Sequence, residues 1–266
     1  GWEDHMVGCQ GVFHTATVYS TSGDSTVIID TANKGTLHIL NAAKKCDISR
    51  IVYTSSIAAV GSIPKGREKT EDDWQTDRSS PYVIAKTESE RLAWELAERL
   101  NLDLRVINPS GVLGGGFVKP TPSVEWFDDA MKGLFPAAPK IPMAFVHVVD
   151  VAVAHRKAFE IDEAQGRFIL APHNNSTIAA VCRRIRELHP HTKSPKRAIP
   201  VSLMSIVVFQ DWVMSWFGAP RRMTRKAVKG YFRGDANLSS EKATRVLGME
   251  WHSFDACIND TVGEFK

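Results

Sequence analysis

The chain has 266 residues, a length that suits one large domain or two lobes sharing a core. Hydrophobic residues make up 43% and charged residues 24%, which is close to the globular average and excludes disordered, collagen-like and coiled-coil classes. The formal net charge is +3, from 33 basic and 30 acidic residues, which is too small an excess to indicate a nucleic-acid-binding protein.

Short β-rich runs and helical patterns alternate through the first 170 or so residues. The predicted strands are Gly11–Thr17, Arg50–Ser56, Asp103–Pro109 and Gly166–Ala171. Helical patterns at Asp30–Cys46 and Tyr82–Leu100 carry apolar side chains on one face. Strands separated by helices of this length pair in parallel through right-handed crossovers. The sequence therefore predicts an α/β fold with a Rossmann-like doubly wound parallel sheet.

The second half of the chain changes character at a loop rich in proline and basic residues, Pro190–Pro200. An apolar stretch, a basic run and two short helical patterns follow it. We expect a smaller, mostly helical lobe set against the sheet. The predicted cofactor-binding core spans residues 1–112 and the substrate lobe residues 113–266, with residues 143–171 returning to the sheet.

The apolar stretch Ile199–Phe217 is interrupted by Pro200, Gln210 and Asp211. It predicts a buried or interfacial helix rather than one that spans a membrane, so we expect no stable membrane insertion. No basic-then-apolar signal segment opens the chain, which favours a cytoplasmic protein. The widely spaced cysteines form no CxxC pair and no metal-binding spacing with histidine. We expect no metal site, and reduced, mostly buried thiols at Cys9, Cys46, Cys182 and Cys257.

Ligands of doubly wound sheets bind beyond the carboxyl ends of the strands. The first candidate site residues are therefore Thr15–Thr17, Thr54–Ser56 and Pro109–Val112. The sharpest single feature is the pair Tyr82 and Lys86, at positions i and i+4 of a predicted helix. That spacing puts both side chains on one face, where an ammonium lowers the pKa of a nearby phenol. Such a tyrosine can act as an acid near neutral pH, although this spacing alone also arises by chance.

A pair of serines, Ser55 and Ser56, follows the second predicted strand, where its end meets the ligand crevice. A hydroxyl there can donate a hydrogen bond to the oxygen of a carbonyl that is being reduced. Taken alone, the two serines are better explained as the start of a loop. Combined with the Tyr82–Lys86 pair in an α/β alternation, however, they form a specific constellation.

These segments together resemble the extended short-chain dehydrogenase/reductase superfamily, in its dihydroflavonol reductase, cinnamoyl-CoA reductase and 3β-hydroxysteroid dehydrogenase branch. The resemblance covers nearly the whole chain. It rests on the segments GCQGVFHTAT, NKGTLHILNAA, VYTSSIAAV, YVIAK, INPSGVLGGG, FVHVVDVAVAH and NLSSEKATRVLGMEW. One position departs from the family pattern, because His38 stands where the family's N-x-x-G-T-x-N helix has its last asparagine.

The resemblance implies roles for particular residues. Tyr82 would give a proton to the carbonyl oxygen, Lys86 would lower the pKa of Tyr82 and bind the nicotinamide ribose, and Ser56 would hold the substrate oxygen. The implied cofactor contacts are Thr15, Ala16, Thr17, Asn33, Thr54, Ser55, Tyr82, Lys86, Pro109, Ser110, Gly111, Val112 and Ser123. The implied cofactor is NADP, with NAD as the alternative, and it would supply the hydride.

In this family a first βαβ unit carries a glycine-rich turn that binds the cofactor pyrophosphate. The sequence begins after that unit, so we expect a fragment of a longer reductase rather than a naturally truncated relative. The cluster Gly111–Gly116 lacks the spacing of a phosphate loop and is interpreted as a flexible turn beside the pocket. The residues that choose between NAD and NADP would lie in the same upstream unit.

Three functions follow from the sequence. The first is reduction of a ketone or aldehyde on a hydrophobic small molecule, catalysed by an NAD(P)H-dependent oxidoreductase. The second is a sugar-nucleotide epimerase or dehydratase, which the apolar second lobe disfavours. The third is a truncated binding protein, which the presence of Ser56, Tyr82 and Lys86 disfavours. A homodimer is compatible with the sequence, which does not fix the oligomeric state.

Other notable residues have simpler explanations. We expect His147 to be structural rather than catalytic. The basic run Arg221, Arg222, Arg225, Lys226 and Lys229 has helical spacing, and such runs are usually solvated faces, with an anionic substrate as the functional alternative. The aromatic side chains of the second lobe are more often core than pocket lining; these are Trp126, Phe127, Trp212, Trp216 and Phe217.

Overall fold

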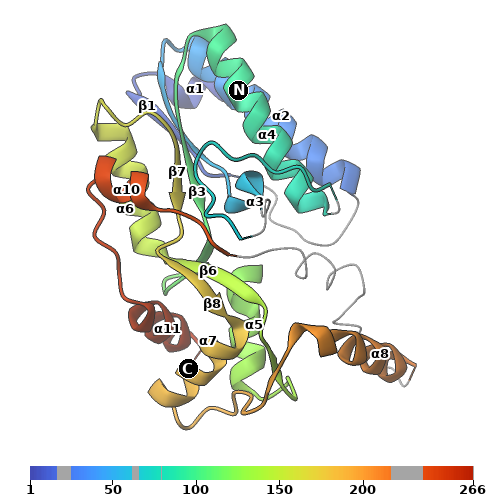
Figure 1. Cartoon of the computed structure of the whole chain (residues 1–266). Coiled ribbons are helices and arrows are strands. Elements are labelled where there is room, and N and C mark those ends of the chain that lie inside the picture. The colour runs from blue at the N-terminus through green and yellow to red at the C-terminus, as the bar shows by residue number, and fades with distance from the viewer. Residues whose placement is uncertain (17–24, 62–65, 79, 217–235, 266) are drawn as a thin grey trace.

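The computed structural model describes residues 1–16, 25–61, 66–78, 80–216 and 236–265 of the chain. Four strands form the main sheet in the order β1-β2-β3-β7 (Figure 1). They are β1 (Gly11–His14), β2 (Arg50–Thr54), β3 (Asp103–Pro109) and β7 (Gly166–Leu170). Each neighbouring pair runs parallel, so the predicted α/β doubly wound sheet is confirmed.

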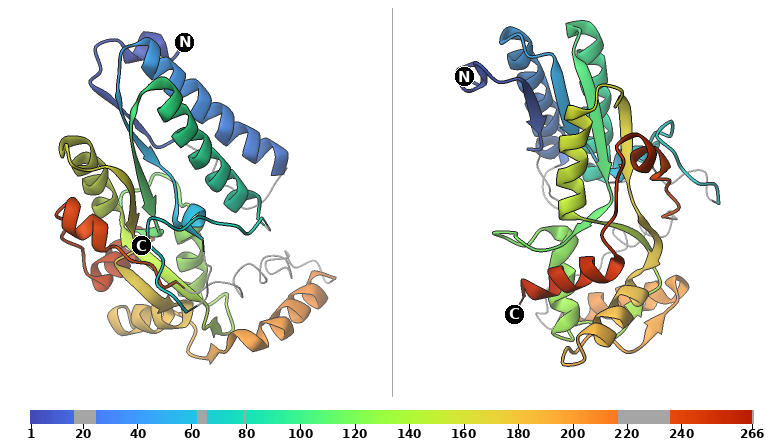
Figure 2. Two further views of the ribbon diagram at one scale, coloured as in Figure 1. Left: turned by 45° about the horizontal axis from the view of Figure 1, so that its top comes forward. Right: turned by 90° about the vertical axis from the view of Figure 1, so that its left-hand side faces the viewer.

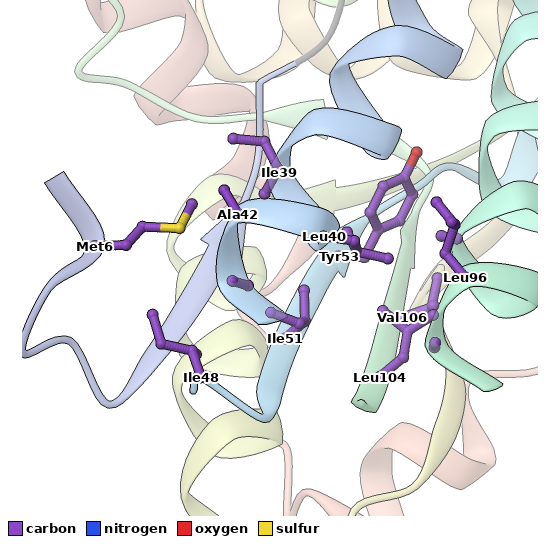
Figure 3. Packing of buried hydrophobic residues seen from close by; sticks show 13 residues of the cluster. Met6, Ile39, Leu40, Ala42, Ile48, Ile51, Tyr53, Leu96, Leu104 and Val106 are labelled. Carbon is purple, nitrogen blue, oxygen red and sulfur yellow. The ribbon is translucent and has the colours of Figure 1, made fainter. Parts of the chain in front are cut away.

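Two long helices cover one face of this sheet, α2 (Ser25–Lys45) and α4 (Pro81–Leu100). Because side chains alternate along a strand, Ile51 and Tyr53 of β2 face these helices while Val52 faces the other way. Figure 3 shows Ile51 and Tyr53 beside Leu104 and Val106, packed against side chains of α2 and α4. This layer carries Tyr82 and Lys86 on the helix next to the strand ends.

The opposite face is covered by α6 (Val148–Glu160) and α10 (Glu241–Val246). In the right-hand view of Figure 2, α6 lies in front of the sheet, with α2 and α4 behind it. Small residues Ala154 and Ala158 of α6 are fully buried against Val52 and Phe168, which lets the helix approach the sheet closely. The main sheet is therefore the middle of three layers.

The second lobe contains a three-stranded sheet that the sequence analysis did not identify. Its order is β4-β6-β8, parallel between β4 and β6 and antiparallel between β6 and β8. The strands are β4 (Gly111–Leu113), β6 (Pro142–His147) and β8 (His173–Thr177). The sequence of β8 is HNNST, which lacks the apolar alternation that indicates a strand, so β8 could not be predicted from its composition. The helices packed on this sheet are α5 (Pro122–Met131), α7 (Ile178–Leu188) and α11 (Phe254–Gly263).

The remaining elements are short or lie at the edges. They are α1 (Glu3–Met6), α3 (Ile57–Val60), the paired strands β5 (Ala138–Pro139) and β9 (Ala198–Ile199), the 3-10 helix η1 (Val201–Leu203) and α8 (Met204–Ser215). No helix within the described residues is both long and apolar enough to cross a membrane.

Several predicted element bounds need correction. The first strand ends at His14, and its predicted end, Thr17, lies outside the described residues. The second strand ends at Thr54, because the hydroxyl of Ser56 caps α3 by accepting a hydrogen bond from the Ala58 amide at 3.1 Å. The first long helix starts at Ser25, earlier than the predicted start at Asp30. The last strand of the sheet ends one residue early, at Leu170.

The apolar stretch after Pro200 forms α8, but only Met204 and Val208 are buried among its described side chains. Trp212 and Trp216 are 37% and 67% exposed, so the expectation that they belong to the core is wrong. Figure 1 shows the reason, since α8 projects from the body of the second lobe. Phe217 lies outside the described residues.

The cysteine prediction is correct in its main point, since all four thiols are free. Cys182 and Cys257 are buried, and burial raises the pKa of both, to about 12 for Cys257. Such thiols remain protonated and inert at neutral pH. The expectation of mostly buried thiols fails for Cys9, which is exposed, and Cys46 is only half-buried.

Candidate active site

A cavity of about 420 Å³ opens where the carboxyl ends of β1, β2 and β3 meet the first residues of the second lobe. It arises because β4 starts at Gly111, two residues after β3 ends, so the chain passes directly from one sheet to the other. The predicted site residues that line it are Thr15, Thr54, Ser55, Ser56, Tyr82, Lys86, Pro109, Ser110 and Val112.

The other predicted site residues lie away from the described lining of this cavity. Ala16 is exposed just after β1, and Asn33 is half-buried on α2. Gly111 sits in β4 under Phe145, where an added Cβ would lie 3.0 Å from the ring. Ser123 belongs to α5, but its side chain is outside what the structure describes, as is all of Thr17. Their proposed contacts with a cofactor stay predictions.

Lys86 lies on the buried face of α4 and is only 4% exposed. Burial disfavours its charged form and lowers the pKa of the ammonium from 10.5 to about 8, against the opposing attraction of Glu90. Among the described residues, its Nζ has one hydrogen bond, donated to the Thr54 carbonyl oxygen at 3.2 Å. An ammonium carries three N–H donors, so it can still donate to a ligand in the cavity. That donor set fits the paired hydroxyls of a ribose.

His14 ends β1 beside the cavity and packs edge-on against the Tyr53 ring, with ring centroids 5.1 Å apart. Burial, and then the positive charge of Lys86, lower the pKa of His14 to about 4. The imidazole is therefore neutral at physiological pH, and Lys86 is the one titratable cation among the described residues that line the cavity.

The two serines after β2 have different environments. Ser56 is 8% exposed and lines the cavity, and its oxygen accepts the helix-capping hydrogen bond from Ala58. Its own hydroxyl hydrogen is not used by that bond and can be donated to a ligand oxygen. Ser55 instead donates its hydroxyl to the Glu90 carboxylate at 2.5 Å, which directs it into the protein core. Ser56 is thus the serine with a donor suited to a ligand.

Two further hydroxyl groups at the cavity wall are used for structure. The Nδ1 of His155 donates to the Val151 carbonyl at 2.7 Å, so its Nε2 accepts from the Thr54 hydroxyl at 2.6 Å when the ring is neutral. Burial lowers the pKa of His155 and favours that neutral form. Ser110 donates its hydroxyl to the Leu170 carbonyl at 2.8 Å. These bonds fix the ends of β2 and β3.

The glycine turn Gly114–Gly116 forms part of the cavity wall and is held by the C-terminal helix. The Gly114 amide donates to the Thr261 hydroxyl at 2.8 Å, and the Gly116 amide donates to the Glu264 carboxylate at 2.9 Å. The turn beside the pocket, predicted as flexible, is thus anchored at two backbone amides.

Replacing Gly114 with alanine is expected to destabilise the protein and displace this turn. Gly114 has φ +127°, and an added Cβ would lie 2.8 Å from Cγ1 of Val148. Backbone strain and overpacking together should cost about 2–5 kcal/mol. Gly116→Ala is the matched control, because Gly116 has φ +81° with no atom within 4 Å of the added Cβ, so only about 1–2 kcal/mol is expected. Urea denaturation of both variants measures the difference, and equal losses would contradict the steric explanation.

Several predicted features have structural roles. His147 is 2% exposed and caps α6, accepting from the Val149 amide at 3.2 Å, as expected for a structural histidine. Phe127 is fully buried and Trp126 partly buried in the second lobe, in agreement with the core prediction. The basic run Arg221–Lys229 lies outside the described residues.

Sequence reasoning missed a buried polar cluster directly behind the site. Glu90, Asn108 and Arg167 are fully or almost fully buried, and all contact one another through the Glu90 carboxylate. One signal was available, since Tyr82, Lys86 and Glu90 recur at intervals of four on the same helix. Asn108 and Arg167 stand within apolar strands, where a polar residue calls for a partner.

A Rossmann-like sheet with an apolar-walled cavity at its carboxyl edge defines the class of nucleotide-cofactor-binding α/β proteins. The model of the NAD dependent epimerase/dehydratase family matches residues 3–171. The chain belongs to this family, and the resemblance inferred from the sequence motifs is confirmed.

Curated relatives are reductases from plants and a cyanobacterium. Cinnamoyl-CoA reductase CAD2 of Medicago truncatula is 36% identical over 205 residues, which cover 71% of this chain and 62% of the relative. Tetraketide alpha-pyrone reductase 2 of Arabidopsis thaliana is 34% identical over 63% of this chain and 57% of the relative. A putative dihydroflavonol 4-reductase of Synechocystis is 27% identical over 98% of this chain and 77% of the relative. The matches to the first two relatives thus span only about three fifths of their length.

Solved structures match nearly the whole chain. Yeast methylglyoxal/isovaleraldehyde reductase Gre2 complexed with NADPH has a TM-score of 0.77 and 26% identity, covering 99% of this chain and 78% of that protein. The structure of gox2253 has a TM-score of 0.83 and 25% identity, covering 99% of this chain and 80% of that protein. These neighbours share the Rossmann-like fold.

Proposed function

We propose that this chain carries the catalytic part of an NADPH-dependent reductase that acts on a ketone or aldehyde of a hydrophobic small molecule. The observation that supports the proposal most is that Ser56, Tyr82 and Lys86 line one cavity at the carboxyl edge of the sheet. The relatives named as reductases of cinnamoyl-CoA, of a tetraketide pyrone and of an aldehyde point to the same reaction type.

In this proposal each side chain has a defined role. A bound nicotinamide cofactor supplies the hydride. Tyr82 donates its phenolic proton to the carbonyl oxygen, and Ser56 donates a hydrogen bond to the same oxygen, where negative charge develops. Lys86 stabilises the tyrosinate that remains and holds the ribose hydroxyls with its unused N–H donors. Thr15, Pro109, Ser110 and Val112 would surround the nicotinamide end.

The second candidate function, that of a sugar-nucleotide epimerase or dehydratase, is compatible with the same fold. Structural neighbours include a UDP-glucose 4-epimerase at 21% identity, a likeness that speaks for the fold alone. Among the described residues, the second lobe lines the cavity mainly with the apolar side chains of Val112, Leu113, Phe117, Val124 and Val148, and Thr121 adds one hydroxyl. A sugar nucleotide needs many polar partners, so this lining favours a hydrophobic carbonyl compound.

NADPH is proposed over NADH because Gre2 proteins of two yeasts, both structural neighbours, are described in complex with NADPH. The deciding measurement is kcat/KM for the two cofactors with one substrate. We expect NADPH to be favoured at least tenfold, which corresponds to about 1.4 kcal/mol. A preference for NADH would overturn this part of the proposal and leave the reaction type standing.

The proposed function is tested by measuring the loss of NADPH fluorescence during turnover. The protein used is the full gene product, including any residues that precede Gly1. The panel contains an aromatic acyl-CoA thioester, an aromatic ketone, an aliphatic aldehyde and UDP-glucose. Consumption of NADPH with a hydrophobic carbonyl compound is the expected result. Interconversion of UDP-glucose without net consumption of NADPH would establish the epimerase instead, and inertness toward the whole panel would favour a binding role.

A further inference from the structure

Glu90 connects the helix of the proposed acid to three strands of the sheet. It lies one turn after Lys86 on α4 and is fully buried. Its Oε2 accepts hydrogen bonds from the Ser55 hydroxyl at 2.5 Å and from Asn108 Nδ2 at 2.8 Å. Its Oε1 accepts from Arg167 Nε at 2.6 Å. One carboxylate thus ties α4 to the end of β2, to β3 and to β7.

Arg167 is itself rigidly held. Its Nη1 donates to the backbone carbonyls of Glu71 at 2.8 Å and Asp73 at 2.6 Å. Its guanidinium stacks over the Trp74 ring, 4.0 Å from the centroid. The charge of Glu90 is therefore compensated by a cation that has little freedom to move.

A buried ion pair is a poor device for stability alone. Removing two charges from water costs several kcal/mol per ion, and apolar residues of similar volume often hold a fold equally well. Beyond packing, the hydrogen bonds of Glu90 and Arg167 fix the relative positions of the segments they join, because each hydrogen bond sets a distance and an angle. The residues at the far ends of these bonds then indicate the purpose.

Those residues are the proposed site itself. Asn108 donates through the same Nδ2 to the Ser56 carbonyl at 3.1 Å, and Ser55 is the residue before Ser56. Thr54, the residue before Ser55, accepts a hydrogen bond from Lys86 through its backbone carbonyl. The Glu90 bonds therefore set the position of the backbone that carries Ser56 relative to the helix that carries Tyr82 and Lys86.

We propose that Glu90 is a positioning residue of this site: its carboxylate, anchored by Arg167, holds the Thr54–Ser56 segment in register with Tyr82 and Lys86. The inference rests on the proposed function and deepens it, since Glu90 lies behind the cavity rather than in its wall. Misplacement of a reacting group by about 1 Å costs on the order of 10²-fold in rate, so such an anchor has a measurable effect.

Glu90 also acts on Lys86 by its charge. Within the described residues, the titratable and charged groups around Lys86 are Glu90 and Tyr82 on α4 and His14 on β1. His14 is neutral at physiological pH, so Glu90 supplies the attraction that opposes the burial of the ammonium. Without it, Lys86 loses its proton at lower pH, and alkaline inactivation begins earlier.

The test compares Glu90→Gln with Glu98→Gln, the same chemical change at an exposed position of the same helix. For Glu90→Gln we expect kcat to fall about 10- to 100-fold, with KM for NADPH changed less than about threefold. The alkaline limb of the kcat profile should move to lower pH. A second readout needs no turnover: the titration of the Lys86 side chain, followed by carbon NMR of labelled lysine, should shift to lower pH than in the wild type, because Glu90 raises the pKa of Lys86. Glu98→Gln should leave all these quantities unchanged.

Glu90→Asp distinguishes the effect of the Glu90 charge from the effect of its hydrogen bonds, because it keeps the carboxylate but shortens the side chain. Its Lys86 titration should stay close to that of the wild type while kcat remains lowered. If Glu90→Gln does not fold, Asn108→Ala removes the link to the Ser56 carbonyl and leaves the ion pair in place. That variant should lower kcat several-fold with KM for NADPH nearly unchanged.

Two outcomes overturn the inference without touching the proposed function. One is an active Glu90→Gln protein with the kcat, pH profile and Lys86 titration of the wild type. The other is a folded Asn108→Ala protein with unchanged kcat. Failure of the proposed function looks different, because the wild-type protein itself would then reduce no carbonyl compound in the panel.

Discussion

Replacing Tyr82 with phenylalanine is expected to lower kcat for carbonyl reduction by a factor of about 10²–10⁴, the usual contribution of a general acid. This corresponds to about 3–5 kcal/mol of transition-state stabilisation. The substitution removes only the hydroxyl and keeps the ring, which is half-buried at the cavity wall. The free energy of unfolding should therefore change by less than about 1 kcal/mol.

Tyr53 provides a matched control with the opposite expectation. Its ring is buried between the sheet and the helices α2 and α4 (Figure 3). Its hydroxyl donates to Ser89 at 2.9 Å and lies 3.2 Å from the Thr36 hydroxyl. Tyr53→Phe should cost about 1–3 kcal/mol of stability, because Ser89 and Thr36 lose a buried partner. Its kcat should stay close to that of the wild type. The same chemical change at two tyrosines thus separates catalysis from folding.

Steady-state kinetics and urea denaturation of both variants decide the assignment. If Tyr82→Phe kept more than about a tenth of the wild-type rate, less than the usual effect of losing such an acid, the proton would have to come from water or another residue. If Tyr53→Phe lost as much activity as Tyr82→Phe, the rate loss would reflect general damage to this layer of the fold.

The sequence contained enough information to predict the main sheet and the meeting of Ser56, Tyr82 and Lys86 in one cavity. Both follow from local regularities: short β-rich runs that alternate with helical patterns, and the four-residue spacing of Tyr82 and Lys86 on α4. Parallel pairing then brings strand ends that are far apart in the sequence to one edge. These regularities and the parallel pairing of the strands were enough to locate the cavity.

The polar cluster behind the site could not be predicted in the same way. Which of the buried polar residues meet depends on the registers of three strands and on the rotation of α4, none of which has a local signal. The role of Ser55 illustrates the limit. Adjacent serines look equivalent in sequence, yet Ser56 caps α3 at the cavity while Ser55 points to Glu90 in the core.

The second lobe was harder still, because its elements depend on partners rather than on pattern. The polar strand β8 exists because β6 pairs with it, with a bulge between Met143 and Phe145. The aromatic side chains of α8 have the spacing of a core helix, but Trp212 and Trp216 are exposed among the described residues. Periodicity predicts which face is apolar and does not say what packs against it.

The second large effect is expected from Lys86→Met, which should abolish the proposed reductase activity and yet stabilise the fold at neutral pH. The ammonium of Lys86 is 4% exposed, and its pKa is about 8 in the folded protein against 10.5 when exposed. Below pH 8 the group is protonated in both states, so the folded state carries the full cost of burying the charge. That cost is at most about 3 kcal/mol for a displacement of this size.

The pH dependence gives this prediction its sign. Between about pH 8 and pH 10.5 the unfolded chain holds the Lys86 proton and the folded protein does not, so the wild type gains stability as the pH rises. Methionine has a similar shape and no charge, so the variant lacks both the cost and its pH dependence. The variant should therefore be the more stable protein at pH 7, and its advantage should vanish as the pH approaches 10.5.

Loss of the hydrogen bond to the Thr54 carbonyl offsets about 1 kcal/mol of the gain, which leaves a net stabilisation of at most about 2 kcal/mol at pH 7. Activity should move in the opposite direction, since in the proposed mechanism the ammonium serves both Tyr82 and the cofactor: kcat should collapse and NADPH should bind more weakly. Lys34→Met, at an exposed lysine of α2, is the control and should change stability by less than about 0.5 kcal/mol at either pH. Urea denaturation at pH 7 and pH 10, with NADPH titration by fluorescence, measures these effects.

A Lys86→Met protein less stable than the wild type at pH 7 would show that the ammonium is held by more favourable contacts than the Thr54 carbonyl and Glu90. The description of Lys86 as a buried charge kept for catalysis at the expense of stability would then be wrong.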